Sequence, residues 1–155
     1  NSIIVTKCPQ NLSEEKQNEL RKKLTVSPNQ QVFFSTINYH SKTLGSLQIS
    51  IDVLHEYEII LITGIANPTP LVEFLKGRYC KIQHIAFSDH HHFSNSEINN
   101  LKESNFILTT EKDFVRLQPR LPDFPIYYLP IKTSIVKEQE ASFKRDIIDA
   151  IVNFS

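Results

Sequence analysis

The chain has few of the residues that build special frameworks: three glycines, two cysteines, no methionine and no tryptophan in 155 residues. Cys8 and Cys80 are too few for a disulfide framework and lack zinc-finger spacing, so we expect structural thiols in a reducing compartment. Seventeen basic and seventeen acidic side chains leave no excess of either sign, which argues against a nucleic-acid partner. The sequence also lacks a secretory leader and the apolar run of about 18 residues that predicts a membrane span.

The remaining composition is that of a folded domain. Apolar residues make up 40% and charged residues 22% of the chain, which excludes disorder as the overall state. The length favours one main core, with room for a short additional segment. The sequence opens at Asn1 directly on a strand-like run without methionine, so we expect a piece of a longer protein.

From Glu58 onward, apolar strands alternate with helical stretches, which is typical of βαβ units. This pattern predicts an α/β fold, with a mostly parallel sheet between two helical layers. The predicted strands are Glu58–Thr63, Ile82–Phe87, Phe106–Thr109 and Ile126–Pro130. The predicted helices between them are Pro70–Lys76, Ser96–Ser104 and Lys112–Leu117, with capping by Ser94 and Glu97 and by Thr110 and Asp113.

The first part of the chain predicts a strand at Ser2–Lys7 and a helix at Ser13–Leu24, with Ser13 as its N-cap. The β-rich runs Gln31–Tyr39 and Leu47–Val53 predict a two-stranded antiparallel linker. We therefore expect three parts, at residues 1–30, 31–53 and 54–155. A final helix is predicted at Val136–Phe154, with one apolar stripe made of Phe143, Ile147, Ala150, Ile151 and Phe154.

Three segments follow predicted parallel strands, and open α/β sheets gather their ligands at that edge. The first, Thr63–Pro68, contains Gly64, which permits close backbone approach, and Asn67. Such a turn can present N–H groups to an anion. An ordinary strand-to-helix turn is the alternative, and spacing alone favours it.

The second segment, Phe87–Phe93, places Asp89 beside His90, His91 and His92. A carboxylate can orient an imidazole that acts as a general base. The same side chains can bind a transition metal. Neighbouring loop residues rarely point the same way, so we expect one or two of the histidines to face a shared site.

The third segment, Thr109–Leu117, begins a predicted helix with Thr110. Lys112 and Arg116 lie four residues apart on one face, close to the positive end of the helix dipole, which suits phosphate. Alternatively, Glu111 and Asp113 cap this helix and pair with those bases.

Five motifs together resemble, in order and spacing, the tetraacyldisaccharide 4′-kinase family of lipid A biosynthesis. They are Val5-Thr6-Lys7, Phe33-Phe34-Ser35 with Tyr39, Thr63-Gly64-Ile65-Ala66-Asn67-Pro68, Phe87-Ser88-Asp89-His90-His91 with Phe93, and Thr109-Thr110-Glu111-Lys112-Asp113 with Val115-Arg116. The likeness runs from Val5 to about Ile131.

The resemblance implies the carboxyl-terminal part of an enzyme related to P-loop NTPases, which moves the γ-phosphate of ATP to the 4′-hydroxyl of tetraacyldisaccharide 1-phosphate. Residues 1–30 would be a remnant of the nucleotide-binding domain. His90 would help an upstream carboxylate to accept the hydroxyl proton, and Asp89 would orient it. We expect anion or substrate contacts from Gly64, Asn67, His91, Thr110, Lys112 and Arg116.

The sequence contains no Gly-x-x-x-x-Gly-Lys-Ser/Thr run, so ATP and Mg²⁺ are expected in the parent protein and not on this piece alone. We accordingly expect the piece to be soluble, to hold no metal and to be inactive. The family further implies a lipid A precursor as partner and a place at the cytoplasmic face of the bacterial inner membrane, reached through an amino-terminal half.

Two other functions stay open at this point. Asp-His-His also occurs in manganese-dependent phosphoesterases, but those enzymes need several carboxylate clusters, and only Asp52 precedes Phe87 here. The other alternative is a non-enzymatic ligand-binding domain. The sequence upstream of Asn1 would distinguish these alternatives from the kinase.

Overall fold

The computed structural model describes residues 2–78 and 80–152, which form two compact units. One unit runs from Tyr39 to Pro130, and the other combines the residues up to Asn38 with those from Ile131 onward. This division differs from the three parts expected at residues 1–30, 31–53 and 54–155. The last strand and helix of the chain join the first ones in the same unit, because their pairing partners lie near the amino terminus.

The Tyr39–Pro130 unit is built on a five-stranded sheet with the order β3-β7-β6-β4-β5. Its strands are β3 (Leu44–Gly45), β4 (Glu58–Thr63), β5 (Lys81–Ala86), β6 (Ile107–Thr109) and β7 (Ile126–Tyr128). Four strands are parallel to their neighbours, and only the short edge strand β3 is antiparallel. The prediction of a mostly parallel α/β sheet is confirmed.

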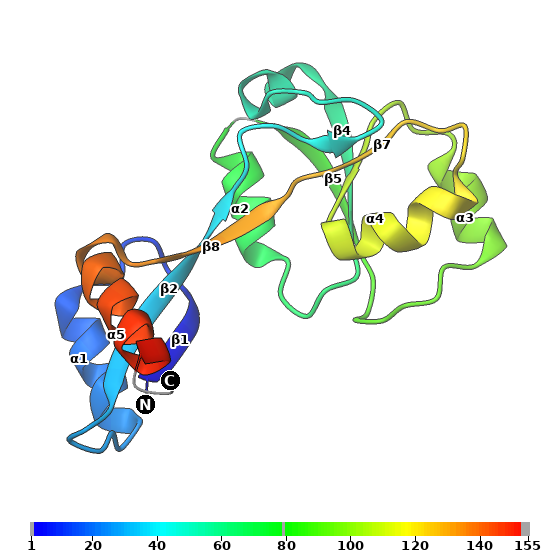
Figure 1. The fold of residues 1–155 in the computed structure, drawn as a ribbon. Helices are drawn as coiled ribbons and strands as arrows, with labels where there is room; N and C mark the ends of the chain where they lie inside the picture. The colour runs from blue at the N-terminus through cyan, green and yellow to red at the C-terminus, as the bar shows by residue number, and fades with distance from the viewer. Residues whose placement is uncertain (1, 79, 153–155) are drawn as a thin grey trace. The chain divides into compact units, whose positions relative to one another are not determined.

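Helices cover both faces of this sheet (Figure 1). They are α2 (Thr69–Lys76), α3 (Asn95–Leu101) and α4 (Glu111–Leu117), with 3-10 turns at η1 (Ile51–Glu56) and η2 (Gln118–Arg120). Alternate β4 residues enter different cores: Leu61 packs with Leu71 and Leu75 of α2, whereas Ile62 packs with residues of α3 and α4. The two cores are what the period-2 alternation of a strand buried on both faces produces.

The second unit is a three-stranded sheet with the order β1-β2-β8. Its elements are β1 (Ser2–Cys8), α1 (Glu14–Lys23), β2 (Gln31–Tyr39, all but its last residue), β8 (Ile131–Ile135), η3 (Lys137–Gln139) and α5 (Glu140–Val152). Phe33 contacts Phe143 of α5 with ring centroids 5.0 Å apart. The ring centroid of its neighbour Phe34 lies 4.9 Å from the guanidinium carbon of Arg21 in α1. Since adjacent strand residues face opposite ways, the two helices cover opposite faces of β2.

The strand β2 was expected to pair with Leu47–Val53 as a linker, but it pairs with β8 instead. The N–H of Val136 donates to the carbonyl of Phe34 at 2.9 Å, and Asn38 donates to Ser134 at 3.2 Å. This opposite order of pairing makes β2 antiparallel to β8. The predicted strand Leu47–Val53 is wrong: its second half forms η1, because Ser50 accepts the N–H of Asp52 and caps that turn.

The final helix begins later in the chain than predicted. It begins at Glu140 and not at Val136, and Phe154 of the predicted stripe lies outside the described residues. Of the remaining stripe, Phe143 is partly buried, while Ile147, Ala150 and Ile151 are exposed.

Cys8 and Cys80 are buried free thiols, as expected, and burial raises the pKa of both. Among the helices of the described residues, none has the length and apolar character needed to cross a membrane.

Candidate functional site

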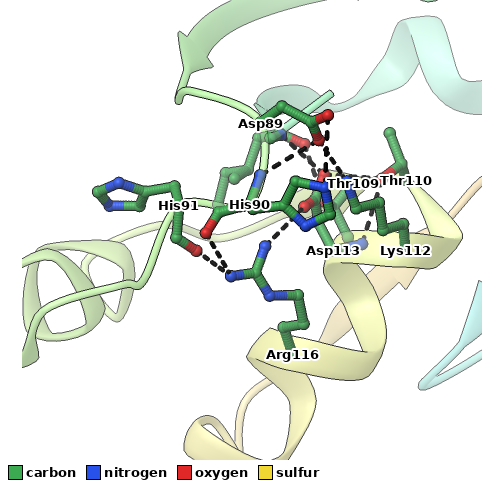
Figure 2. Close-up of polar contacts among 10 residues, drawn as sticks. Asp89, His90, His91, Thr109, Thr110, Lys112, Asp113 and Arg116 are labelled. Carbon is green, nitrogen blue, oxygen red and sulfur yellow. Dashed lines mark hydrogen bonds and ion pairs between the residues drawn. The ribbon is translucent and has the colours of Figure 1, made fainter. Parts of the chain in front are cut away.

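The three segments singled out from the sequence meet at the carboxyl ends of β4, β5 and β6 (Figure 2). In the sheet, β4 lies between β5 and β6. The loops that leave these three parallel strands therefore emerge side by side, at the edge where α/β folds place their sites. Two of the loops bond to the first turn of α4, the helix that follows β6.

A fully buried carboxylate, that of Asp113, joins two of these segments. Its Oδ2 accepts the backbone N–H of Gly64 and the hydroxyl of Thr110, both at 2.7 Å. The Thr110 hydroxyl accepts the N–H of Asp113 in return, at 3.2 Å, and caps α4. The predicted capping pair is confirmed, and the carboxylate also ties the loop after β4 to this helix.

The turn at Gly64 is therefore occupied by the protein's own anion. Its N–H points at Asp113, and a Cβ at Gly64 would lie 2.8 Å from Oδ1 of that carboxylate. The close approach explains why glycine stands here. Asn67 is exposed, and its side-chain oxygen accepts the N–H of Thr69 at the start of α2. Within the described residues, no hydrogen bond links Asn67 to the network around Asp113.

Asp89 and His90 lie above the first turn of α4 (Figure 2). Oδ1 of Asp89 is bound by the ammonium group of Lys112, and Oδ2 lies 3.7 Å from Nε2 of His90. The His90 side chain is 81% exposed, so its imidazole is open to a ligand. The hydrogen bond from Lys112, helped by His90, holds the pKa of the Asp89 carboxyl below its usual value. Asp89 is therefore an anion at neutral pH.

The backbone of His90 is in the left-handed region, with φ +62°, which is uncommon for a residue other than glycine. Arg116 lies under this peptide. Its Nη2 donates to the carbonyl of His90 at 3.2 Å and also to the carbonyl of His91. The two bases predicted to share one face of α4 do so, and both bind the loop after β5.

His91 points away from this group (Figure 2). Its Nε2 lies 3.1 Å from the Glu97 carboxylate, and its ring stacks on Phe87 with centroids 4.5 Å apart. Glu97 also accepts the N–H of Ser94, completing the predicted capping box of α3. These bonds, the one from the Ser94 backbone first, lower the pKa of Glu97 to about 2. His91 thus anchors the loop to α3.

Two features of the site were missed from the sequence. Asp113 was foreseen as a helix cap and as a partner of the neighbouring bases, but not as a link between segments 49 residues apart. His84 on β5 was not singled out, and its Nε2 lies 2.8 Å from the hydroxyl of buried Thr63. Burial, together with the charge of Lys76, lowers the pKa of His84. The alternation of β5 places His84 beside the strand end but gives no signal of this bond.

The geometry suits proton transfer with electrostatic support. An exposed imidazole stands beside an ionised carboxylate that a lysine holds in place, the arrangement that orients a general base. Within residues 2–78 and 80–152, no three His, Cys, Asp or Glu side chains gather as a metal site would require. The carboxylate clusters that a two-metal phosphoesterase needs are not found there.

Comparison with known proteins identifies tetraacyldisaccharide 4′-kinases as relatives of this chain. The family model described as tetraacyldisaccharide-1-P 4′-kinase (LpxK) matches residues 1–152. The tetraacyldisaccharide 4′-kinase of Flavobacterium johnsoniae is 42% identical over 144 residues, which cover 90% of this chain and 42% of that protein. The enzyme of the same name from Bacteroides thetaiotaomicron is 36% identical over 173 residues, covering 94% and 45%.

A solved structure shares the fold. It is the "apo" form of LpxK from Aquifex aeolicus in complex with ATP, with a TM-score of 0.53 and 20% identity. The match covers 91% of this chain and 50% of that one. This chain therefore spans less than half the length of the two curated relatives and half of the solved one.

Proposed function

Because this chain belongs to the tetraacyldisaccharide-1-P 4′-kinase family, we propose that it is the carboxyl-terminal part of such a kinase. The whole protein would transfer the γ-phosphate of ATP to the 4′-hydroxyl of tetraacyldisaccharide 1-phosphate, a step of lipid A biosynthesis. The observation that supports this role for the site is the exposed His90 imidazole, held 3.7 Å from an ionised Asp89.

In this proposal His90 helps to take the proton of the sugar hydroxyl as the hydroxyl oxygen attacks the phosphate. Nε2 of His90 faces Asp89, so we assign proton acceptance to Nδ1, with the Asp89 charge stabilising the imidazolium that results. Lys112 keeps Asp89 in place through its other oxygen. Phosphoryl transfer depends mainly on positioning and charge neutralisation, and a fixed imidazole contributes the first of these.

The residues of this chain do not fit a nucleotide-phosphate site of the P-loop kind. The sequence has no Gly-x-x-x-x-Gly-Lys-Ser/Thr run, and the N–H of Gly64 is already bound to Asp113. We assign ATP and Mg²⁺ to the rest of the whole protein, and place that protein at the cytoplasmic face of the inner membrane. In this proposal the ammonium group of Lys112 contributes positive charge near an anionic substrate, and Thr110 supports it indirectly by capping α4.

The decisive experiment is a lipid-kinase assay on the whole protein that contains this chain. Transfer of ³²P from γ-labelled ATP to tetraacyldisaccharide 1-phosphate is followed by thin-layer chromatography. We expect His90→Ala to lower kcat by roughly 10²–10⁴-fold, the usual effect of losing a general base. His92→Ala is the matched control, because His92 is an exposed neighbour on the same loop. An unchanged rate in His90→Ala would remove this histidine from the mechanism.

The same assay tests the division of labour within the enzyme. Residues 1–155 alone should show no ATP-dependent phosphorylation of the lipid, since we assign the nucleotide to other parts of the protein. The chain should retain its folded circular-dichroism spectrum, so that inactivity is not a result of unfolding. Robust phosphorylation by these residues would refute the assignment of ATP to the remainder of the protein.

A further inference from the structure

We propose that Arg116 is a positioning residue, whose guanidinium fixes the direction of the His90 imidazole by binding two consecutive backbone carbonyls. The inference rests on the proposed function, because that function gives His90 its role. Nη2 of Arg116 donates to the carbonyl of His90 and to that of His91 (Figure 2). The sequence had indicated a different role for this arginine, that of an anion ligand.

The backbone of His90 needs such support. A non-glycine residue at φ +62° is in a sparsely populated conformation, and surrounding contacts must hold it there. The turn is closed by the N–H of His91, which donates to the carbonyl of Ser88 at 3.1 Å. Rotation of the His90 peptide back to the common region would redirect both carbonyls and swing the imidazole away from Asp89. Arg116 prevents this rotation by binding both carbonyl oxygens.

Arg116 is itself held by the protein. Its Nη1 lies 3.9 Å from Oδ1 of Asp113 and is buried, with no hydrogen-bond partner among the described residues. Its guanidinium carbon lies 5.8 Å from the centre of the Phe93 ring. Since Nη2 binds the loop and Nη1 faces the buried carboxylate of Asp113, contacts within the protein occupy both ends of the guanidinium. A planar fork with donors on separate nitrogens suits this task, and an ammonium group does not.

The kinetic test uses the whole kinase with Arg116→Ala and Arg116→Lys. We expect kcat to fall about 10- to 100-fold in both variants, as for a catalytic group displaced by about 1 Å. The KM for ATP and for the lipid should stay within about threefold, because Arg116 binds the loop carbonyls and in this proposal contacts neither substrate. Guanidinium ion at millimolar concentration should partly restore kcat in Arg116→Ala, which a variant that had merely unfolded would not show. A raised KM with unchanged kcat, largely corrected in Arg116→Lys, would overturn the proposal in favour of an anion ligand.

A second measurement does not depend on kinase activity. In the 155-residue chain, nuclear magnetic resonance reports the HN–Hα coupling of His90 and the amide exchange of His91. We expect Arg116→Ala to change the coupling and to speed the exchange. Arg120→Ala is the matched control: Arg120 binds the Phe93 carbonyl and the Asn95 side chain, so its loss should loosen the far end of the loop and leave His90 unchanged.

The two measurements separate the possible failures. If the coupling and the exchange are the same in Arg116→Ala as in the parent chain, the inference is refuted whatever the enzyme does. If they change but the whole protein phosphorylates no lipid, the proposed function fails and the control of the His90 backbone by Arg116 stands.

Discussion

The buried carboxylate of Asp113 gives the sharpest test of how the site is held together. It accepts hydrogen bonds from the Gly64 N–H and the Thr110 hydroxyl, each at 2.7 Å, and faces the Arg116 guanidinium. Asp113→Asn keeps the size of the side chain and removes its charge. Both bonds then become neutral ones, and the new amide N–H group lies beside the guanidinium.

The size of the effect follows from these contacts. A hydrogen bond to a charged group contributes about 1.5–3 kcal/mol and a neutral one about 0.5–1.5 kcal/mol. Two bonds weakened by about 1 kcal/mol each predict a loss of about 2 kcal/mol in the free energy of unfolding of Asp113→Asn. Asp113→Ala should lose about 3–5 kcal/mol, because it leaves the Gly64 N–H and the guanidinium of Arg116 without their anion.

Urea unfolding of the 155-residue chain at neutral pH, followed by far-ultraviolet circular dichroism, measures both losses. Asp123→Asn is the control, because this carboxylate is exposed and its loss should change the free energy by no more than about 0.5 kcal/mol. If Asp113→Asn behaves like Asp123→Asn, the carboxylate does not bind the β4 loop to α4, and the account of the site given above is wrong.

Three further changes test other parts of the structure. Gly64→Ala should lower the free energy of unfolding by about 1–3 kcal/mol through overpacking, since its Cβ would lie 2.8 Å from the Asp113 carboxylate. In urea unfolding, the double variant with Asp113→Ala should lose less than the sum of the two single losses, because the clash is then absent. Strictly additive losses would contradict the clash. The folded pKa of Glu97, about 2, lies below its ordinary value of 4.5, so its carboxylate stabilises the fold above pH 4.5 and this stabilisation is lost as the pH falls towards 2. In thermal unfolding the Tm difference between parent and Glu97→Gln should therefore shrink over that range, whereas a difference that stays constant with pH would refute the pKa assignment. Leu61→Ala should lower the free energy of unfolding by about 2–5 kcal/mol, measured in urea, because Leu61 is fully buried. A loss below about 1 kcal/mol would contradict this expectation and would mean that neighbouring side chains fill the cavity.

The strands of the parallel sheet were predictable because their signal is local. Glu58–Thr63 was predicted to the residue, since a short apolar run between turn residues is typical of a buried strand. β8, at Ile131–Ile135, was missed. Its first three residues are exposed, and its pairing partner β2 lies about a hundred residues earlier in the chain. Such distant pairing leaves no periodic mark in the segment itself.

The meeting of the three polar segments at one edge of the sheet was also predictable, whereas the contacts of their side chains were not. Polar residues that follow neighbouring parallel strands indicated this edge. Charge patterning could not show which carboxylate is buried, and only the structure assigns that place to Asp113. Nor could it show that His91 turns towards Glu97 while His90 stays exposed. The two neighbouring histidines point in different directions because the backbone of His90 itself is in the left-handed conformation.

The unit from Tyr39 to Pro130 interrupts the other unit in the sequence, and its two ends are joined by the His40 N–H, which donates to the Pro130 carbonyl at 2.9 Å. A ribosome therefore delivers this insertion completely before it delivers β8 and α5. Until β8 and α5 are synthesised, β1 is the only neighbour of β2 in the β1-β2-β8 sheet, and the Phe33 side chain that α5 later covers remains exposed to water. Co-translational folding of the interrupted unit must accordingly wait for β8 and α5, while the inserted unit can be finished earlier.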